Sequence, residues 1–302
     1  MASTPSTVGL FSLGEMGHSV AAVLVQHGVQ VVTCLAGRSP RSQRLAAKAG
    51  VRDLPSVAEV VRRADIILSI VVPSAAPKVG AEVARAIRET GRSPLFVDAN
   101  SISPSTVRGI ERAITQAGGR FVDASIIGGA QGVAGGRATF YASGREASTF
   151  AGLREYGLRI NVIGDEVGQA SGLKMLYAGL TKGLSALSVE LLLPARALGL
   201  LDPLLAKLQA DSPDIANFMQ RRILDLPMHA GRRSEEMEEL AGACREMGLP
   251  MGMALAGRDS LKAIGDLRLR DRYDEATMEA WDFGSVLEVL AQGLTRQPDA
   301  SH

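Results

Sequence analysis

The sequence predicts an α/β fold: a doubly wound, mostly parallel sheet followed by an all-helical C-terminal domain. In the first half of the 302-residue chain, short runs of β-branched residues alternate with amphipathic stretches, which is typical of a parallel sheet with helices on both faces. Beyond residue 168 this period-2 alternation almost disappears, and helical spacing dominates. A boundary near residues 164–168 gives predicted domains of residues 1–165 and 166–302.

The predicted strands and helices alternate along the first domain. Because crossovers between parallel strands are right-handed, the carboxyl ends of the strands meet at one edge, where ligands bind. Strands are expected at residues 7–13, 29–35, 66–72, 95–97, 121–122 and 139–142, with helices at 19–26, 41–49, 57–62 and 77–89. In the second domain, helices are expected at 170–198, 204–223, 234–246 and 253–264, and Gly231 is expected in a loop between them.

The composition argues against several classes of function. A net charge of +1 and an aromatic content of 4% do not favour a nucleic-acid-binding surface. Cys34 and Cys244 lack metal-ligand spacing, so no metal site is expected, and few cysteines suit the cytoplasm. The N-terminus lacks a signal-peptide pattern, and charged residues and a proline interrupt the most apolar region, residues 184–205. We expect a cytoplasmic protein that binds neither nucleic acid nor a membrane.

A glycine-rich turn between the first strand and the first helix carries the clearest chemistry. Gly14 would let backbone amides approach a pyrophosphate at the positive end of the helix, and Gly17 would let the helix pack on the strand. Ser12 stands where the usual G-x-G-x-x-G pattern has its first glycine. A tight turn without a ligand is the alternative. We predict a Rossmann-type, dinucleotide-binding domain, with contacts from Ser12, Leu13, Gly14, Glu15, Met16 and Gly17.

The end of the second predicted strand indicates which dinucleotide binds. Sites for NAD usually carry an acidic residue about 20 residues after the glycine turn, where it binds the ribose diol. Here that position is Gly37, and no Asp or Glu occurs between Glu15 and Asp53. Arg38 and Ser39 follow instead, and a guanidinium with hydroxyl donors suits a 2′-phosphate. A solvated basic loop is the alternative reading; we predict NADP(H).

Five segments, taken in order, resemble those of a known family. They are Gly9 to Gly17, Ser69 to Pro73, Asp98 to Pro104, Asp123 to Gly129, and Gly164-x-x-x-Gly168 followed by Lys174. Together they resemble the β-hydroxyacid dehydrogenase family, which is related to 6-phosphogluconate dehydrogenase and 3-hydroxyisobutyrate dehydrogenase. The resemblance implies that Val71, Val72, Pro73 and Asn100 border the nicotinamide, that Ser125, Ile127, Gly128, Gly129 and Ala178 line the substrate site, and that Lys174 is catalytic.

Two positions depart from the family pattern. Ile127 stands where the family has a serine that contacts the polar head of the substrate, and Ala178 stands where it has an asparagine. Both changes remove hydrogen-bonding groups, so they put a simple 3-hydroxy carboxylate substrate in question and favour a more apolar pocket. The segment from His229 to Met237 resembles a poorly characterised branch of the superfamily that has a distinctive helical C-terminal domain.

Lys174 is the candidate proton donor. A lysine serves this role when burial and a nearby cationic nicotinamide lower its pKa; a surface lysine is the alternative. Lys174, Tyr177, Ala178 and Thr181 share one face of the predicted helix, which we expect to border an interdomain cleft. Tyr177 is predicted either to donate a hydrogen bond to the substrate or to pack as an aromatic residue.

Four further polar residues have simpler readings. Lys182 is expected to be structural or to tune substrate binding. His229 is expected on a surface loop. Asp98 and Asp123 are expected to end strands and to cap turns rather than to act as bases.

These features favour an NADP(H)-dependent oxidoreductase acting on a small carbonyl or hydroxy compound, the reaction of a CH–OH dehydrogenase. The alternatives are an imine reductase of similar architecture, in which another residue usually occupies the lysine position, and a non-catalytic NADP(H)-binding sensor. The apolar helix at residues 178–198 exceeds what one small helical domain can cover, which predicts a homodimer.

Overall fold

The computed structural model describes residues 7–273, 277, 278 and 280–294. The chain divides into two compact units, Met1–Met175 and Leu176–His302. The division falls inside the long helix α8 (Gln169–Ala197), whereas the predicted boundary at residues 165 and 166 falls in the loop before it. About the first two turns of α8 therefore belong with the sheet.

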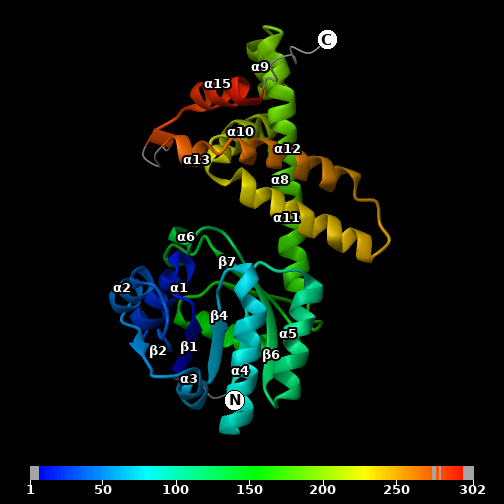
Figure 1. Cartoon of the computed structure of the whole chain (residues 1–302). Coiled ribbons are helices and arrows are strands. Elements are labelled where there is room, and N and C mark those ends of the chain that lie inside the picture. Colours follow the sequence, from blue (N-terminus) through cyan, green and yellow to red (C-terminus); the bar gives the residue numbers. More distant parts are fainter. Residues whose placement is uncertain (1–6, 274–276, 279, 295–302) are drawn as a thin grey trace. The chain divides into compact units, whose positions relative to one another are not determined.

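Unit 1 is built on one eight-stranded sheet in the order β3-β2-β1-β4-β5-β6-β7-β8 (Figure 1). Neighbouring strands are parallel except β6 and β7, which are antiparallel, so the mostly parallel sheet predicted from the sequence is confirmed. The strands are β1 (Thr7–Phe11), β2 (Gln30–Thr33), β3 (Arg52–Asp53), β4 (Ile66–Ser69), β5 (Leu95–Asp98), β6 (Arg120–Ile127), β7 (Thr139–Ser143) and β8 (Ile160–Gly164).

Helices cover both faces of the sheet, and each face has its own hydrophobic core. One core includes Leu10 and Val97, and the other includes Ile67 and Phe96, because successive side chains of a strand point to opposite faces. The helices of this unit are α1 (Glu15–Gln26), α2 (Pro40–Lys48), α3 (Val57–Arg63), α4 (Ala76–Thr90), α5 (Pro104–Gln116), α6 (Gln131–Ala134) and α7 (Ala147–Ala151), with 3-10 turns η1 (Pro73–Ala75) and η2 (Gly152–Tyr156).

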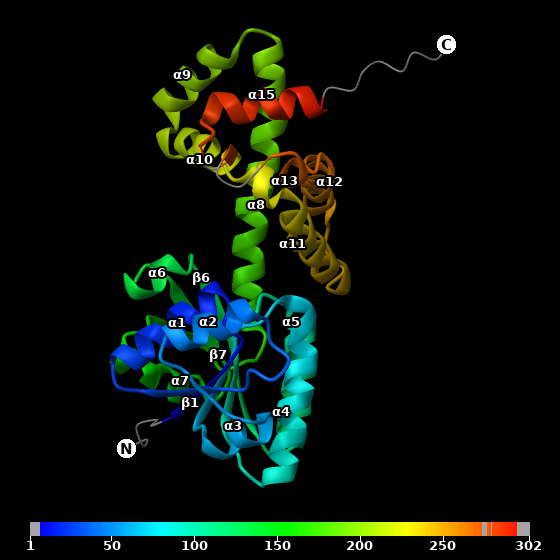
Figure 2. The same ribbon diagram turned by 60° about the vertical axis from the view of Figure 1, so that its left-hand side comes forward.

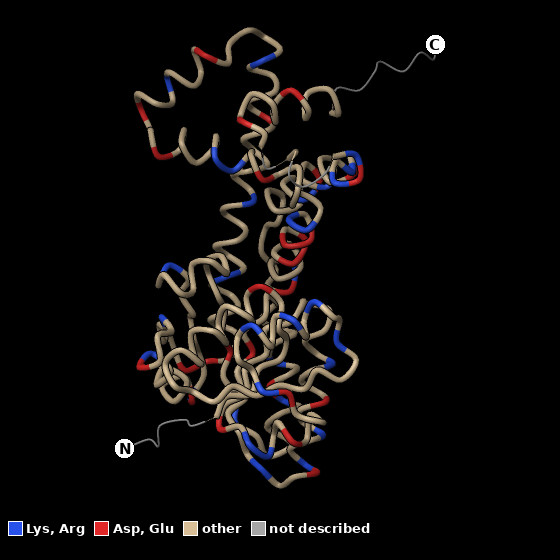
Figure 3. Tube along the Cα trace, turned by 90° about the vertical axis from the view of Figure 1, so that its left-hand side faces the viewer, with Lys and Arg blue, Asp and Glu red and all other residues tan. Residues whose placement is uncertain are grey.

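Unit 2 is all helical in the part of the chain that the structure describes (Figure 2). Its core gathers residues such as Leu192, Leu226, Leu261 and Leu290. Besides the rest of α8, it contains α9 (Leu201–Asp211), α10 (Pro213–Ile223), α11 (Leu226–Glu246), α12 (Gly252–Asp266), α13 (Leu269–Arg272) and α15 (Phe283–Leu294). Acidic and basic residues are interspersed along the chain in both units (Figure 3).

Two expectations for this unit were wrong. The helix predicted at residues 204–223 is two helices, because Pro213 begins a new one. Gly231 is not in a loop: α11 begins at Leu226, with Pro227 in its first turn. A Cβ placed on Gly265 of α12 would lie 2.8 Å from the Cα of Gly231, so these glycines allow α11 and α12 to cross closely.

Among the described residues, α8 is the one helix that is long and apolar enough to cross a membrane by length and composition, and 39% of its most apolar window is buried. The sequence predicted no segment of this kind, because charged residues and a proline interrupt residues 184–205. The difference arises because the helix begins at Gln169 and is already apolar before residue 184. One helix of this kind is weak evidence, since a core helix passes the same test.

Candidate functional site

The glycine turn after β1 is shaped to hold an anionic group. Gly14 is the N-cap of α1 and makes no side-chain cap, so the first amides of the helix are open to a ligand. A Cβ on Gly14 would meet nothing within 4 Å, which leaves space beside the turn, whereas a Cβ on Gly17 would lie 1.9 Å from the carbonyl oxygen of Ser12. The side chain of Leu13 is buried in the core, so only its backbone faces the turn. These residues fit the pyrophosphate of a dinucleotide.

The loop after β2 presents one arginine that the described residues leave unpaired. Arg38 is half-buried, and its guanidinium makes no hydrogen bond or ion pair within the described ranges. Ser39 caps α2, because its Oγ accepts a hydrogen bond from the amide of Ser42 at 3.3 Å. Arg41 is engaged by Glu15, with Nη2 to Oε1 at 3.0 Å. Arg38 is thus the cation of this loop that can take a phosphate without breaking another contact.

The carboxylate of Asp53 also lies beside the end of β2, and it was not among the site residues predicted from the sequence. Oδ1 of Asp53 accepts a hydrogen bond from the amide of Leu35 at 2.8 Å. Sequence reasoning missed it because β3 has two exposed residues and carries no apolar signal. The only hint was the position of Asp53 as the first acid after Glu15.

Asn100 connects the ends of β4 and β5. Its Oδ1 accepts from the amide of Val71 at 2.6 Å, its Nδ2 donates to Oγ of Ser69 at 3.0 Å, and its amide donates to Oδ1 of Asp98 at 3.0 Å. Asn100 is buried, whereas Val72 is 65% exposed and precedes η1, which begins at Pro73. The structure therefore places Asn100 where it orders the Val71–Pro73 edge rather than where it faces solvent.

The predicted substrate motif is divided between buried and open positions. Ser125 is fully buried, and its Oγ has no hydrogen-bond partner, so its side chain does not reach an open surface. Gly128 has a φ of 128°, and a Cβ there would lie 2.7 Å from the Cα of Ala138, which makes glycine necessary for packing. Ile127 is half-buried, and a Cβ on Gly129 would meet nothing within 4 Å. Of this motif, Ile127 is partly exposed and Gly128 and Gly129 are exposed, so these three positions are open to a ligand.

Asp98 and Asp123 face each other on adjacent strands of the sheet. They are register partners of β5 and β6, and both are fully buried. Burial and, to a smaller extent, the charge of Asp123 raise the pKa of Asp98 to about 7, and the hydrogen bonds from Asn100 oppose this rise. Oδ2 of Asp98 has no partner. The expectation that both residues end strands holds for Asp98 alone, because Asp123 lies within β6 and binds the start of α8.

The α8 helix carries the remaining candidates. Lys174 is half-buried and belongs to unit 1, Tyr177 is 46% exposed, and Ala178 is buried. Lys182 pairs with Glu236, with 2.8 Å between Nζ and Oε2, which gives it a structural partner. The loop predicted around His229 was wrong, because this residue lies in α11, where burial and the charges of Arg232 and Arg233 lower its pKa.

The sheet order, the open turn at α1 and the polar strand ends define a dinucleotide-binding protein of the Rossmann class. Residues 7–155 match the NAD binding domain of 6-phosphogluconate dehydrogenase, and residues 195–264 match a domain of unknown function, DUF1932. The chain belongs to the 6-phosphogluconate dehydrogenase-like family of hydroxyacid dehydrogenases, in a branch that carries this second domain.

Two relatives are similar over most of the chain. An uncharacterised 28.5 kDa protein of Methanothermus fervidus is 32% identical over 77% of this chain and 88% of its own length. The conserved protein MTH1747, of unknown function and structurally similar to 3-hydroxyacid dehydrogenases, is 35% identical, with a TM-score of 0.72 over 87% of this chain and 99% of its own.

Characterised relatives are more distant. The mitochondrial 3-hydroxyisobutyrate dehydrogenase of Drosophila melanogaster is 27% identical over 46% of this chain, and the match spans 42% of the fly enzyme. An imine reductase from Myxococcus stipitatus, solved with NADP+, is 21% identical with a TM-score of 0.54, over 95% of this chain and 100% of its own, and shares the fold.

Proposed function

We propose that the protein is an NADP(H)-dependent oxidoreductase that acts on a small carbonyl or hydroxy compound, with Lys174 as the general acid and base. One observation carries the proposal: the strand register aligns Phe11, Ser69, Asp98 and Asp123 in one line across β1, β4, β5 and β6. The glycine turn follows the first of these residues, Asn100 follows the third, and the start of α8 binds the fourth. The cofactor turn and the helical turn before Lys174 thus belong to the same edge of the sheet.

The residues of the chain would divide the work of the reaction. The amides of residues 12–17 bind the pyrophosphate, and Arg38 binds the 2′-phosphate. A bound nicotinamide supplies hydride for reduction or accepts it for oxidation. In reduction the ammonium of Lys174 gives a proton to the carbonyl oxygen, and in oxidation its amine takes the proton from the hydroxyl.

The substrate is expected to be less polar than a simple hydroxy acid. Ile127 and Ala178 are apolar, and they occupy the positions at which the family resemblance implies a serine and an asparagine. This apolar character also favours the second candidate, an imine reductase, since an imine needs fewer hydrogen-bond donors than a carboxylate. Lys174 favours the carbonyl reaction.

Binding and turnover test the proposal directly. NADPH and NADH are titrated against the purified protein by calorimetry, and NADPH oxidation is then followed with aldehydes, ketones, 3-oxo acids and cyclic imines. We expect NADPH to bind more tightly and a carbonyl compound to be reduced. Turnover of imines alone would select the imine reductase. Tight NADPH binding without any turnover would select the sensor, and no binding of either nucleotide would overturn the proposal.

Arg38→Ala is expected to weaken NADPH binding by about 10- to 100-fold, because a charge-assisted contact contributes roughly 1.5–3 kcal/mol. The affinity for NADH should stay the same, because NADH lacks the 2′-phosphate. Lys48→Ala, at the exposed C-terminal end of the helix that follows Arg38, is the control and should change neither affinity. Isothermal titration measures both dissociation constants.

A preference for NAD(H) would give a different result with two variants. If the carboxylate of Asp53 binds a ribose diol, Asp53→Asn weakens NADH binding and Arg38→Ala leaves NADPH binding unchanged. That pair of results would assign the site to NAD.

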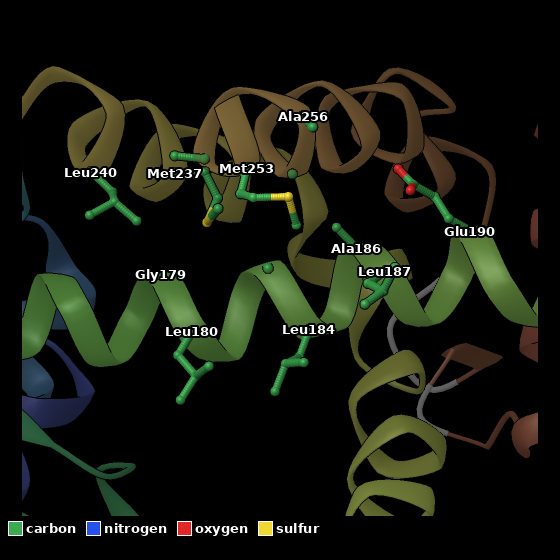
Figure 4. Close-up of a pocket in the computed structure, with 13 residues that line it drawn as sticks. Gly179, Leu180, Leu184, Ala186, Leu187, Glu190, Met237, Leu240, Met253 and Ala256 are labelled. Atoms are coloured by element: carbon green, nitrogen blue, oxygen red, sulfur yellow. The ribbon is translucent and has the colours of Figure 1, made fainter. Parts of the chain in front are cut away.

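We further propose that unit 2 forms a homodimer through α8. A cavity of about 250 Å³ lies among α8, α11 and α12, and its lining includes Gly179, Gly183 and Gly257. Leu180 is 62% exposed and Met253 is 79% exposed, and both are among the residues that line this cavity. Leu180 and Leu184 project from α8 on the side away from α11 and α12 (Figure 4). A two-fold interface brings the same surface of both copies together, so the exposed leucines of one copy would pack against the cavity of the other.

Leu180→Glu is expected to convert the dimer to a monomer at micromolar concentration, because a carboxylate would be buried without a partner at the interface. Sedimentation velocity measures the mass of the protein in solution. Gln209→Glu, which adds the same charge at an exposed position of α9, should leave the dimer intact. A wild-type protein that sediments as a monomer would refute the interface.

A further inference from the structure

The start of α8 is capped by side chains from two strands of the sheet. Oδ2 of Asp123 on β6 accepts hydrogen bonds from the amides of Gly168 at 2.9 Å and Ser171 at 3.0 Å, and its Oδ1 accepts from Oγ of Ser171 at 2.6 Å. Oγ of Ser143 on β7 donates to Oδ2 of Asp123 at 3.2 Å and accepts from the amide of Ala170 at 3.0 Å. Residues distant in sequence thereby satisfy amides that a helix start leaves without partners.

All three side chains of this cap are inaccessible to solvent. Asp123 and Ser143 are fully buried, and Ser171 is nearly so. Burial raises the pKa of Asp123, and the hydrogen bonds from Ser171, Gly168 and Ser143 oppose that rise. A carboxylate at this place also interacts favourably with the positive end of the helix. The cap therefore fixes the first turn of α8 against β6 and β7.

Lys174 follows Ser171 by one helical turn. Residues three apart on a helix lie on the same side, so a hydrogen bond at Ser171 fixes both the height and the rotation of the turn that carries the lysine. Asp123 is the β6 member of the line of residues described above, and Ser143 is its register partner on β7. The sheet is therefore connected to the amine of Lys174 through the carboxylate of Asp123, the hydroxyl groups of Ser143 and Ser171, and one turn of helix.

We propose that Asp123, Ser143 and Ser171 are positioning residues for Lys174, so that the two strands set where the amine stands relative to the reacting carbon. This inference rests on the proposed role of Lys174. It assigns the three residues to catalysis without contact with the substrate, and it distinguishes them from ordinary helix caps, whose loss lowers stability and leaves the rate unchanged.

Ser171→Ala tests the proposal against a matched loss of a helix cap. It is expected to lower kcat at least about tenfold, because small displacements of a catalytic group are costly, while the dissociation constant for NADPH and the KM of the organic substrate stay near their wild-type values. Ser56→Ala removes the hydroxyl that caps α3, whose Oγ accepts a hydrogen bond from the amide of Glu59 at 3.2 Å, so it is a comparable loss in the same unit. Its kcat should match that of the wild type.

Asp123→Asn gives a second and milder variant. It keeps the shape of the side chain and one acceptor oxygen but loses the charge, so we expect it to fold and to show a smaller fall in kcat than Ser171→Ala. Equal kcat values for Ser171→Ala and Ser56→Ala would overturn the proposal.

Two measurements that need no turnover separate this inference from the proposed function. Amide hydrogen exchange at residues 168–171 should accelerate in Ser171→Ala, and the rate at which a water-soluble acylating reagent labels Lys174 should change with it. If the wild-type protein shows no turnover but both changes occur in Ser171→Ala, the cap still positions Lys174, and only the proposed enzymatic role is overturned. Unchanged labelling of Lys174 despite faster exchange would mean that the cap does not set the position of the amine.

Discussion

Lys174→Met is expected to lower kcat by about 100- to 10,000-fold, the usual contribution of a positioned general acid or base. Methionine keeps much of the length and apolar character of the lysine stem but cannot carry a proton. The dissociation constant of NADPH should change little, because the predicted phosphate contacts lie on the turn at residues 12–17 and on Arg38. Steady-state kinetics and calorimetry on the same preparation measure both quantities.

Lys182→Met is the matched control on the same helix. Its amine already pairs with Glu236, and Arg232 also pairs with Glu236 at 2.6 Å, so the carboxylate keeps a partner in the variant. We expect this control to keep its kcat. If Lys174→Met also kept its kcat, the proton would come from another group, and the hydroxyl of Tyr177 would be the next residue to replace.

Asp98→Asn is expected to stabilise unit 1 at pH 8 and to remove part of the pH dependence of folding. The pKa of Asp98 rises from 3.8 to about 7 in the folded chain, so the unfolded chain ionises this group first as the pH increases. The stability that the protonated carboxyl contributes is complete below pH 4 and is lost progressively as the pH rises to about 7. A shift of this size corresponds to about 4 kcal/mol. Asparagine carries no charge and avoids that loss.

Urea unfolding at pH 5 and pH 8, followed by far-ultraviolet circular dichroism, measures the effect. Fluorescence is unsuitable, because the single tryptophan of the chain, Trp281, lies in unit 2. Asp165→Asn, which removes a carboxylate at an exposed position of the same unit, is the control and should behave as the wild type. Equal loss of stability between the two pH values in Asp98→Asn and wild type would show that Asp98 does not titrate in this window.

The parts of the fold that could be predicted from the sequence are those that depend on local pattern. The strands near residues 66–72 and 95–97 stand out because every residue of β4 and β5 is buried, and buried parallel strands are continuously apolar. The glycine turn could also be predicted from a local pattern, because the geometry of the turn itself accounts for Gly14 and Gly17. β8 was missed because most of its residues are exposed and show no alternation.

The parts that could not be predicted depend on contacts between distant residues. Asp123 and Ser171 are 48 positions apart, and no local pattern connects a strand carboxylate to the start of a later helix. Gly231 looked like a break because glycine is unfavourable within helices, and only the close approach of Gly265 explains its place in α11. The motif that resembles a known family placed Ser125 near the substrate, and its burial became visible only from packing.

The reversal of direction at β7 decides where the polypeptide leaves the sheet. β7 runs back from Thr139, opposite Ile127, to Ser143, opposite Asp123, and β8 runs beside it in the same direction. The chain therefore emerges next to Asp123, and α8 starts within reach of that carboxylate. The two parallel strands at this end of the sheet, β7 and β8, thus set the origin of the helix. Lengthening β7 or β8 by two residues is therefore expected to displace Lys174 without moving the glycine turn that follows β1.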